Sequence, residues 1–158
     1  MPDSENLIRR QMAEQMQETF ASGLNAVTWA LLRSGSRSAA DDEKMLYAAF
    51  ASAYHYLETG SAAEQQRAEW LISRVYAVLG NGRESLRHAE RCNALTLANA
   101  ADMAEYDKAF ALEALARANA VAGNAVEADK IRAQAEAAGK AIVDEQSRKV
   151  FMDELNWK

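Results

Sequence analysis

The stretch WLISRVYAVLGNGRE, residues 70–84, joins the end of one amphipathic segment to the start of another. Apolar side chains before Gly80 recur at spacings of three and four, as they do on one face of an α-helix. Glycine is the residue type that most often ends a helix in the left-handed conformation. Asn81, followed three positions later by Glu84, is typical of a helix N-terminus. The stretch therefore predicts two helices joined by a very short corner.

The same signals mark the other corners of the chain. A capping residue followed by a glutamate three positions later recurs at Ser61 and Glu64, Asp102 and Glu105, and Asn124 and Glu127. Gly60 and Gly123 precede two of these caps, where we expect left-handed residues like Gly80. Together with the apolar periodicity, these signals predict about seven helices, at residues 5–33, 40–59, 62–79, 82–98, 102–122, 125–138 and 141–156. Gly23 either interrupts the first helix or is tolerated within it.

The composition favours one all-α domain over residues 1–158. Alanine, the best helix former, occurs 34 times among the 158 residues, whereas there is one proline. Val, Ile, Leu and Phe number only 29, but the net charge of -5 is too small to indicate disorder. Eighteen of the alanines lie between Ala98 and Ala141, so we expect closely packed helices in the C-terminal half.

Charge and hydropathy exclude several classes of partner. No run of 18 apolar residues is present, which predicts no membrane span, and the N-terminal residues do not resemble a signal peptide. The acidic balance offers no basic excess to neutralise phosphates, so we expect no nucleic-acid partner. The single cysteine cannot form an internal disulfide, which suits a reducing compartment. We expect a cytoplasmic protein.

An internal repeat appears at a shift of 43 residues. The pattern R-x-x-A-V-x-G-N-x-x-E occurs at residues 74–84 and again at residues 117–127. The identities fall on positions that end one helix and begin the next. They indicate either a true repeat or two tight helical corners that share the same capping requirements.

These residues resemble a tetratricopeptide-type helical hairpin. The positions that carry the resemblance are Ser73, Tyr76, Leu79, Gly80, Ser85 and Cys92 in one unit, and Ala116, Gly123, Ala128 and Ala135 in the next. The clearest units are residues 62–98 and 102–138. The period of 43 in place of 34, the lack of a closing proline and Asn119 at the aromatic position depart from the family pattern.

The resemblance implies antiparallel helical hairpins stacked as a short right-handed superhelix that binds a protein or peptide. The whole chain also resembles small bacterial proteins of the same length, a resemblance that implies no activity.

Eight of the twelve aromatic residues lie in the first half of the chain. Clustered Trp and Tyr side chains offer large contact areas with a polar tip, as binding surfaces do. The candidate binding residues are Trp29, Tyr47, Tyr54, His55, Trp70 and Arg74. We expect the surface carrying Tyr47, Tyr54, Trp70 and Arg74 to be concave and partly exposed; the alternative is an ordinary helical core.

No catalytic or metal-binding constellation is evident. His88 and Cys92 share a helix face and could hold part of a zinc site or form a base and nucleophile, but Cys92 occupies a small-residue position that favours an inert buried thiol. Arg33 and Arg37 in a serine-rich loop could bind phosphate, although the acidic residues after them favour a solvated loop. We therefore expect no enzyme activity, metal or cofactor.

The sequence thus favours a non-enzymatic module for protein or peptide interaction or for assembly. The long first helix is more than two hairpins need, so we expect it to pair with a second copy as a homodimer. The alternative is a small-molecule-binding protein or enzyme with an aromatic pocket around Trp29, Tyr54, His55 and Trp70.

Overall fold

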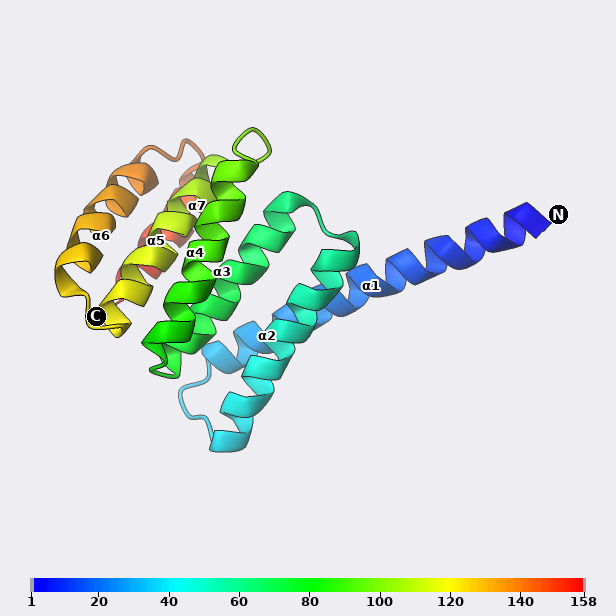
Figure 1. Ribbon diagram of the computed structural model, residues 1–158, viewed down its shortest axis with the longest axis horizontal. Helices are drawn as coiled ribbons and strands as arrows, with labels where there is room; N and C mark the ends of the chain where they lie inside the picture. Colours follow the sequence, from blue (N-terminus) through cyan, green and yellow to red (C-terminus); the bar gives the residue numbers. More distant parts are fainter. Residues whose placement is uncertain (1, 158) are drawn as a thin grey trace.

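The computed structural model describes residues 2–157, with side chains from Glu5 onward, and these residues form seven α-helices and no strand (Figure 1). The predicted all-α class is confirmed. The helices are α1 (Pro2–Leu32), α2 (Ala39–Thr59), α3 (Ala62–Val78), α4 (Gly82–Ala98), α5 (Glu105–Val121), α6 (Ala125–Lys140) and α7 (Glu145–Leu155). Gly23 does not interrupt α1.

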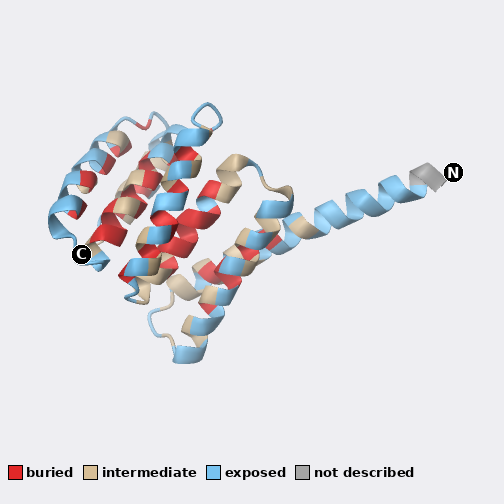
Figure 2. Ribbon diagram, viewed as in Figure 1, coloured by how far each residue is buried: buried red, intermediate tan, exposed pale blue. Residues whose placement is uncertain are grey.

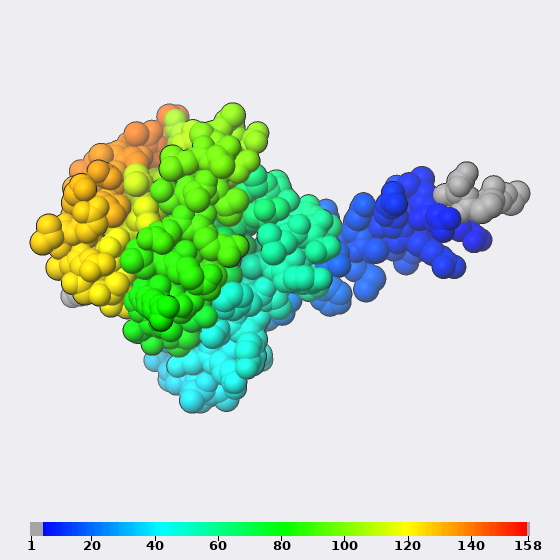
Figure 3. Space-filling model, in the orientation of Figure 1, coloured from blue at the N-terminus to red at the C-terminus, as the bar shows by residue number. Residues whose placement is uncertain are grey.

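Each helix packs against the next one in the chain, so the helices form a stack of antiparallel neighbours (Figure 1). Helix α5 also contacts α3 and α7, which brings these odd-numbered helices to one side of the stack. The first half of α1 leaves this body and projects as a single helical arm (Figure 3). The molecule therefore has two distinct parts, a body of packed helices and an exposed arm.

The glycine corners follow the expectation at two of three positions. Gly80 and Gly123 are left-handed, with φ of 73° and 86°. Gly60 is extended instead, with φ of -76°. Glycine is needed there because a Cβ would lie 2.5 Å from the carbonyl oxygen of Tyr56. At that corner the side chain is excluded by space and not by backbone conformation.

Two of the four predicted helix caps are confirmed, and both act through contacts with residues nearby in the sequence. Ser61 accepts a hydrogen bond from the N–H of Glu64 in a capping box, and Asn81 accepts one from the N–H of Glu84. Of the other two, Asp102 is not at a helix start, and Asn124 is at the N-cap position of α6 but does not cap with its side chain. Helix α5 begins at Glu105 and not at Asp102, because the carboxylate of Asp107 accepts the N–H of Ala104 at 3.1 Å.

Asn124 makes no side-chain cap because its amide donates to Oδ1 of Asn119 at 3.0 Å instead. The last helix also begins later than residue 141. Asp144 caps it by accepting the N–H of Ser147 at 2.7 Å.

Small residues form much of the core, as the alanine distribution predicts. Trp70 and Leu71 of α3 pack on a layer of small side chains from α4 and α5, which are Ala89, Cys92, Ala111, Ala114 and Ala118. Figure 2 shows the buried residues gathered on the facing sides of these helices, while the arm of α1 is exposed. Gly82 lies so close to α5 that a Cβ would come within 2.6 Å of the Ala122 backbone.

Among the described residues, no helix is both long enough and apolar enough to cross a bilayer.

Candidate functional site

The six candidate binding residues fall into separate groups in the structure. Trp29 of α1 and Trp70 of α3 stack with ring centroids 5.6 Å apart. His55 of α2 stacks instead on Phe20 of α1, and Tyr54 contacts the edge of the His55 ring. The aromatic candidates on α1, α2 and α3 therefore lie in two separate groups and do not form a single concave surface.

The tryptophan pair lines a cleft of about 300 Å³ on the side of the stack where odd-numbered helices meet. Residues one helical turn apart, on one face of each of α1, α3, α5 and α7, line this cleft. The cleft is lined by Asn25, Trp29, Arg33, Gln66, Arg67, Trp70, Leu71, Tyr106, Asp107, Phe110, Val150 and Glu154. Aromatic walls with a few polar groups are the usual make-up of a ligand pocket.

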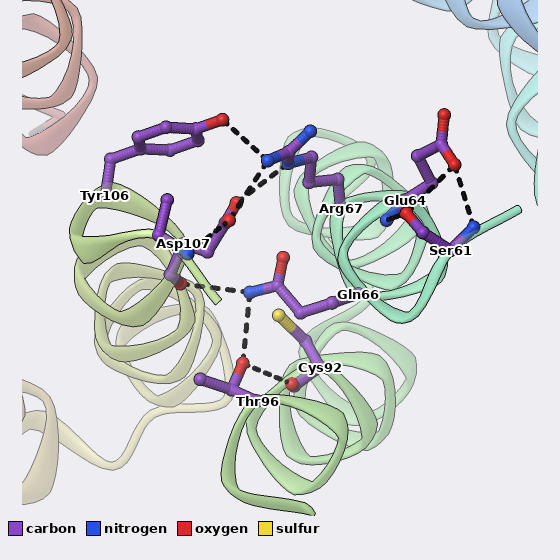
Figure 4. A network of polar contacts seen from close by, with 9 residues as sticks. Ser61, Glu64, Gln66, Arg67, Cys92, Thr96, Tyr106 and Asp107 are labelled. Carbon is purple, nitrogen blue, oxygen red and sulfur yellow. Dashed lines mark hydrogen bonds and ion pairs between the residues drawn. The ribbon is translucent and has the colours of Figure 1, made fainter. Parts of the chain in front are cut away.

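Two guanidinium groups lie on the rings of this cleft. Arg33 lies over the Trp29 ring, 5.0 Å from its centroid, and Arg67 lies over Tyr106 at 5.1 Å. Arg67 also donates to both carboxylate oxygens of Asp107, at 2.8 and 3.0 Å, and to the Tyr106 hydroxyl at 2.6 Å (Figure 4). The bidentate contact with Asp107 raises the pKa of Arg67 and fixes its position.

Gln66 is the one cleft residue with a fully buried, incompletely satisfied side chain. Its amide nitrogen donates to the Thr96 hydroxyl at 3.1 Å and to the Asp107 carbonyl oxygen at 3.0 Å. Its Oε1 has no hydrogen-bond partner among the described residues. Figure 4 shows this oxygen turned away from Thr96, toward the side where Arg67 and Asp107 lie. A buried acceptor of this kind is costly unless something donates to it.

A buried ion pair lies behind Trp70. The indole N–H of Trp70 donates to Oε2 of Glu113 at 2.7 Å, and Nε of Arg117 donates to Oε1 of the same carboxylate at 2.6 Å. Burial raises the pKa of Glu113, against the opposite effect of Arg117 and of the Trp70 hydrogen bond. Arg117 also donates to the Glu154 carbonyl oxygen at 2.9 Å, which ties α5 to α7.

Arg74 belongs to this polar cluster and is not a free cation on a surface. Its Nε lies 3.5 Å from the carboxylate of Glu154. Burial lowers the pKa of Arg74, and the neighbouring charge of Arg117 lowers it further. Arg74 lies near Trp70, as the sequence predicts, but its positive charge is paired with Glu154 inside the chain.

The second group lies on an exposed apolar surface. Phe20, Tyr54 and His55 form a continuous set of rings, with centroids 5.4 Å apart for Phe20 and His55 and 5.5 Å for Tyr54 and His55. Nδ1 of His55 is hydrogen-bonded to Oε1 of Gln17, which joins α2 to α1. Tyr54 is 57% exposed and Phe20 is 50% exposed.

From Phe20 the apolar surface continues along the arm. Ile8, Met12 and Met16 are 54%, 60% and 56% exposed and precede Phe20 at spacings of four residues. We call Ile8, Met12, Met16 and Phe20 the arm stripe. Spacing by four places these side chains along one face of the helix.

Tyr47 stands apart from both groups. Its side chain is 66% exposed, and its hydroxyl donates to Glu43 one turn earlier on α2, at 3.1 Å. This contact raises the pKa of the Tyr47 phenol.

The histidine and cysteine of α4 are both buried. Nδ1 of His88 lies 2.6 Å from Oε2 of Glu69, and the His88 ring stacks on Tyr76. Cys92 has no exposed surface, and burial raises the pKa of its thiol strongly. No group of three or more potential metal ligands occurs in the part of the chain that the structure describes. In the loop before α2, Arg37 pairs with Asp42 at 2.7 Å.

Comparisons with protein-family models, with curated proteins and with solved structures found no match.

Several cleft residues carry no local signal in the sequence. Gln66 is a polar residue on the buried side of α3. It is unusual for that reason, but the sequence alone does not show which side of the helix is buried. Asp107 joins the cleft through its contact with Arg67, 40 positions earlier in the chain. Glu154 joins it from α7, the last helix. The spacing of Asn25, Trp29 and Arg33 by four residues is the one signal that could have extended the predicted site.

Proposed function

We propose that this protein is a non-enzymatic assembly module that pairs with a second copy of itself through α1. The observation that carries the proposal is the arm stripe, four large apolar side chains that are at least half exposed on a helix projecting from the body. Contiguous apolar surface of this kind marks an interaction site.

The arm has little support within its own chain. Residues 5–16 and 18–20 are all exposed, and only Ala21 begins the buried contact with α2. Most helices in proteins are stabilised by packing of an apolar face, and the arm stripe has little such packing among the described residues. Packing of the arm stripe against a partner would supply that stabilisation.

A second copy is the occupant that fits the stripe. A two-fold contact uses the same surface on both chains, so the surface has to be complementary to itself. In an antiparallel pair centred near Glu14, Ile8 of one copy faces Phe20 of the other and Met12 faces Met16, which matches each end of the stripe with the other.

The geometry of the arm also suits this pairing. The stripe spans residues 8–20, about 18 Å at 1.5 Å per residue, and an antiparallel arrangement leaves the two bodies at opposite ends. The charged residues Arg10, Glu14 and Glu18 lie about half a turn away from the stripe and stay in solvent. The rings of Tyr54 and His55 extend the same surface onto the body.

The proposal includes tetratricopeptide-like units at residues 62–98 and 102–138. The repeated corner supports this, since Gly80 and Gly123 are both left-handed at equivalent positions of consecutive hairpins. The single cysteine is buried and free, which suits a reducing compartment, so the proposal places the protein in the cytoplasm.

Sedimentation velocity of matched variants tests the self-association. Met12→Gln combined with Met16→Gln makes the stripe polar while keeping good helix formers. We expect the unchanged chain to sediment at twice 17.4 kDa and this variant at 17.4 kDa. The control, Arg10→Gln combined with Glu14→Gln, changes the opposite face and should remain dimeric. A wild-type chain that sediments only as a monomer would refute the proposal.

A second candidate function, small-molecule binding, is favoured by the cleft at Trp29 and Trp70. The cleft contains Trp29 and Trp70 of the aromatic pocket that the sequence leaves open, but not Tyr54 or His55.

A further inference from the structure

The geometry points to a binding site in this cleft for a small planar aromatic carboxylate that carries a hydrogen-bond donor on its ring. The inference does not depend on the pairing of α1, because the cleft and the arm stripe share no residue. It deepens the second candidate function by assigning the chemical class of the ligand.

The size and the walls of the cleft select a single ring. A volume of about 300 Å³ lies at the small end of ligand pockets, which range from about 300 to 1,000 Å³. Trp29 and Trp70 form one wall, and Tyr106, Phe110 and Val150 contribute from α5 and α7. Aromatic and aliphatic walls of this kind favour a flat apolar ligand.

The buried end of the site needs a donor. Oε1 of Gln66 is an acceptor without a partner, and the amide cannot simply turn over. Its nitrogen donates to the Thr96 hydroxyl and to the Asp107 carbonyl oxygen, and reversing the amide would place its oxygen against the Asp107 carbonyl oxygen, which cannot donate. A ligand hydroxyl or N–H that reaches Oε1 would remove the cost of the unpaired acceptor.

The open end of the site favours an anion. Arg33 is exposed at the rim, and it forms no ion pair with any carboxylate whose position the structure describes. The two cleft carboxylates are already engaged, Asp107 by Arg67 and Glu154 by Arg74 and Arg117. The charge that remains at the cleft is therefore positive.

The same arrangement disfavours a cationic ligand. Aromatic walls alone would attract a cation, but the rings of Trp29 and Tyr106 already carry the guanidinium groups of Arg33 and Arg67. An incoming ammonium group would meet two like charges. A carboxylate, in contrast, gains a charge-assisted contact with Arg33.

Three probes of one shape separate these requirements in calorimetric titrations of the full-length chain. 4-Hydroxyphenylacetate has the ring, the donor and the carboxylate; phenylacetate lacks the donor; tyramine replaces the carboxylate with an ammonium group. We expect 4-hydroxyphenylacetate to bind about fivefold more tightly than phenylacetate, the effect of one hydrogen bond. Tyramine should bind more weakly than 4-hydroxyphenylacetate. Equal affinities for the three probes, or no binding of any, would overturn the inference.

Two variants assign these preferences to residues. Gln66→Met removes the acceptor at similar volume, so 4-hydroxyphenylacetate should bind no better than phenylacetate, while phenylacetate binds as before. Arg33→Gln should weaken both acids by about threefold and reduce their advantage over tyramine. Arg83→Gln, an exposed arginine on α4 away from the cleft, is the matched control and should change nothing.

The outcome distinguishes this inference from the pairing of α1. If Gln66→Met weakens both acids equally, Gln66 has only a structural role and the assignment of the donor is wrong. The chain carrying Met12→Gln and Met16→Gln should keep the full probe preference, because it leaves every cleft residue in place. The comparison of the three probes uses the unchanged chain and so stands even if a variant fails to fold.

Discussion

The indole N–H of Trp70 donates a 2.7 Å hydrogen bond to Oε2 of Glu113, a carboxylate with no exposed surface. Through this bond the aromatic wall of the cleft is joined to the buried ion pair of Glu113 and Arg117. Arg117 in turn donates to the carbonyl oxygen of Glu154 on α7. The position of the cleft wall therefore depends on a polar cluster that spans α3, α5 and α7.

Replacing Trp70 by Phe should destabilise the fold by about 1–3 kcal/mol, the cost of leaving a buried acceptor without one of its donors. Trp29→Phe is the matched control, because Trp29 is half-buried and its indole N–H has no partner among the described residues. Urea unfolding of both variants measures the difference. Equal losses of stability in the two variants would show that the Trp70 hydrogen bond contributes nothing beyond ring packing.

Glu113 should make the free energy of unfolding depend on pH. Burial raises its pKa in the folded chain above the ordinary value of 4.5. Between these two pKa values the native state binds more protons than the unfolded state, so stability is fully present below the unfolded pKa and falls as pH rises through the window.

The matched variant is Glu113→Gln, which cannot ionise. The unfolding free energy of the unchanged chain, relative to that of this variant, should decrease as pH rises from the unfolded pKa toward neutrality. Urea unfolding at a series of pH values measures this difference. A difference that is constant with pH, or that moves in favour of the unchanged chain, would contradict the raised pKa.

Gly23 and Gly139, which lie inside α1 and α6, should respond in opposite ways to substitution by alanine. A Cβ on Gly139 would lie 2.2 Å from Cε1 of Phe151, a fully buried ring, so Gly139→Ala should destabilise by about 1–3 kcal/mol through overpacking. A Cβ on Gly23 would have no neighbour within 4 Å, and alanine should stabilise α1 there by up to about 1 kcal/mol. Thermal unfolding distinguishes the signs, and a stabilised Gly139→Ala variant would contradict the close packing of α6 on α7.

The helices were predictable because the signals that end and begin them are local. Ser61 and Asn81 cap through contacts with residues three positions away, and Gly80 and Gly123 adopt the left-handed conformation at their corners. Asp102 failed as a predicted cap because the carboxylate of Asp107 binds the backbone of Ala104 and moves the helix start.

The candidate site was predictable only in part, because its partners come from distant positions. Trp29 and Trp70 meet as expected for aromatic residues on facing helices. The roles of Gln66 and Arg74 depend on contacts with Asp107 and with Glu154, 41 and 80 positions away, and no periodicity reveals those. The arm stripe has the spacing of an ordinary core helix, so only the structure reveals that Ile8, Met12 and Met16 are more than half exposed among the described residues.

Disulfide trapping between copies tests the central claim, antiparallel pairing through α1, most directly. Cys92 is fully buried with a raised thiol pKa, so a cysteine placed on the arm would be the reactive one. When the Ile8→Cys and Phe20→Cys chains are mixed and oxidised, we predict a cross-linked product of twice 17.4 kDa, whereas Ile8→Cys alone should remain uncross-linked. Efficient cross-linking of Ile8→Cys to itself, or no product from the mixture, would contradict the account.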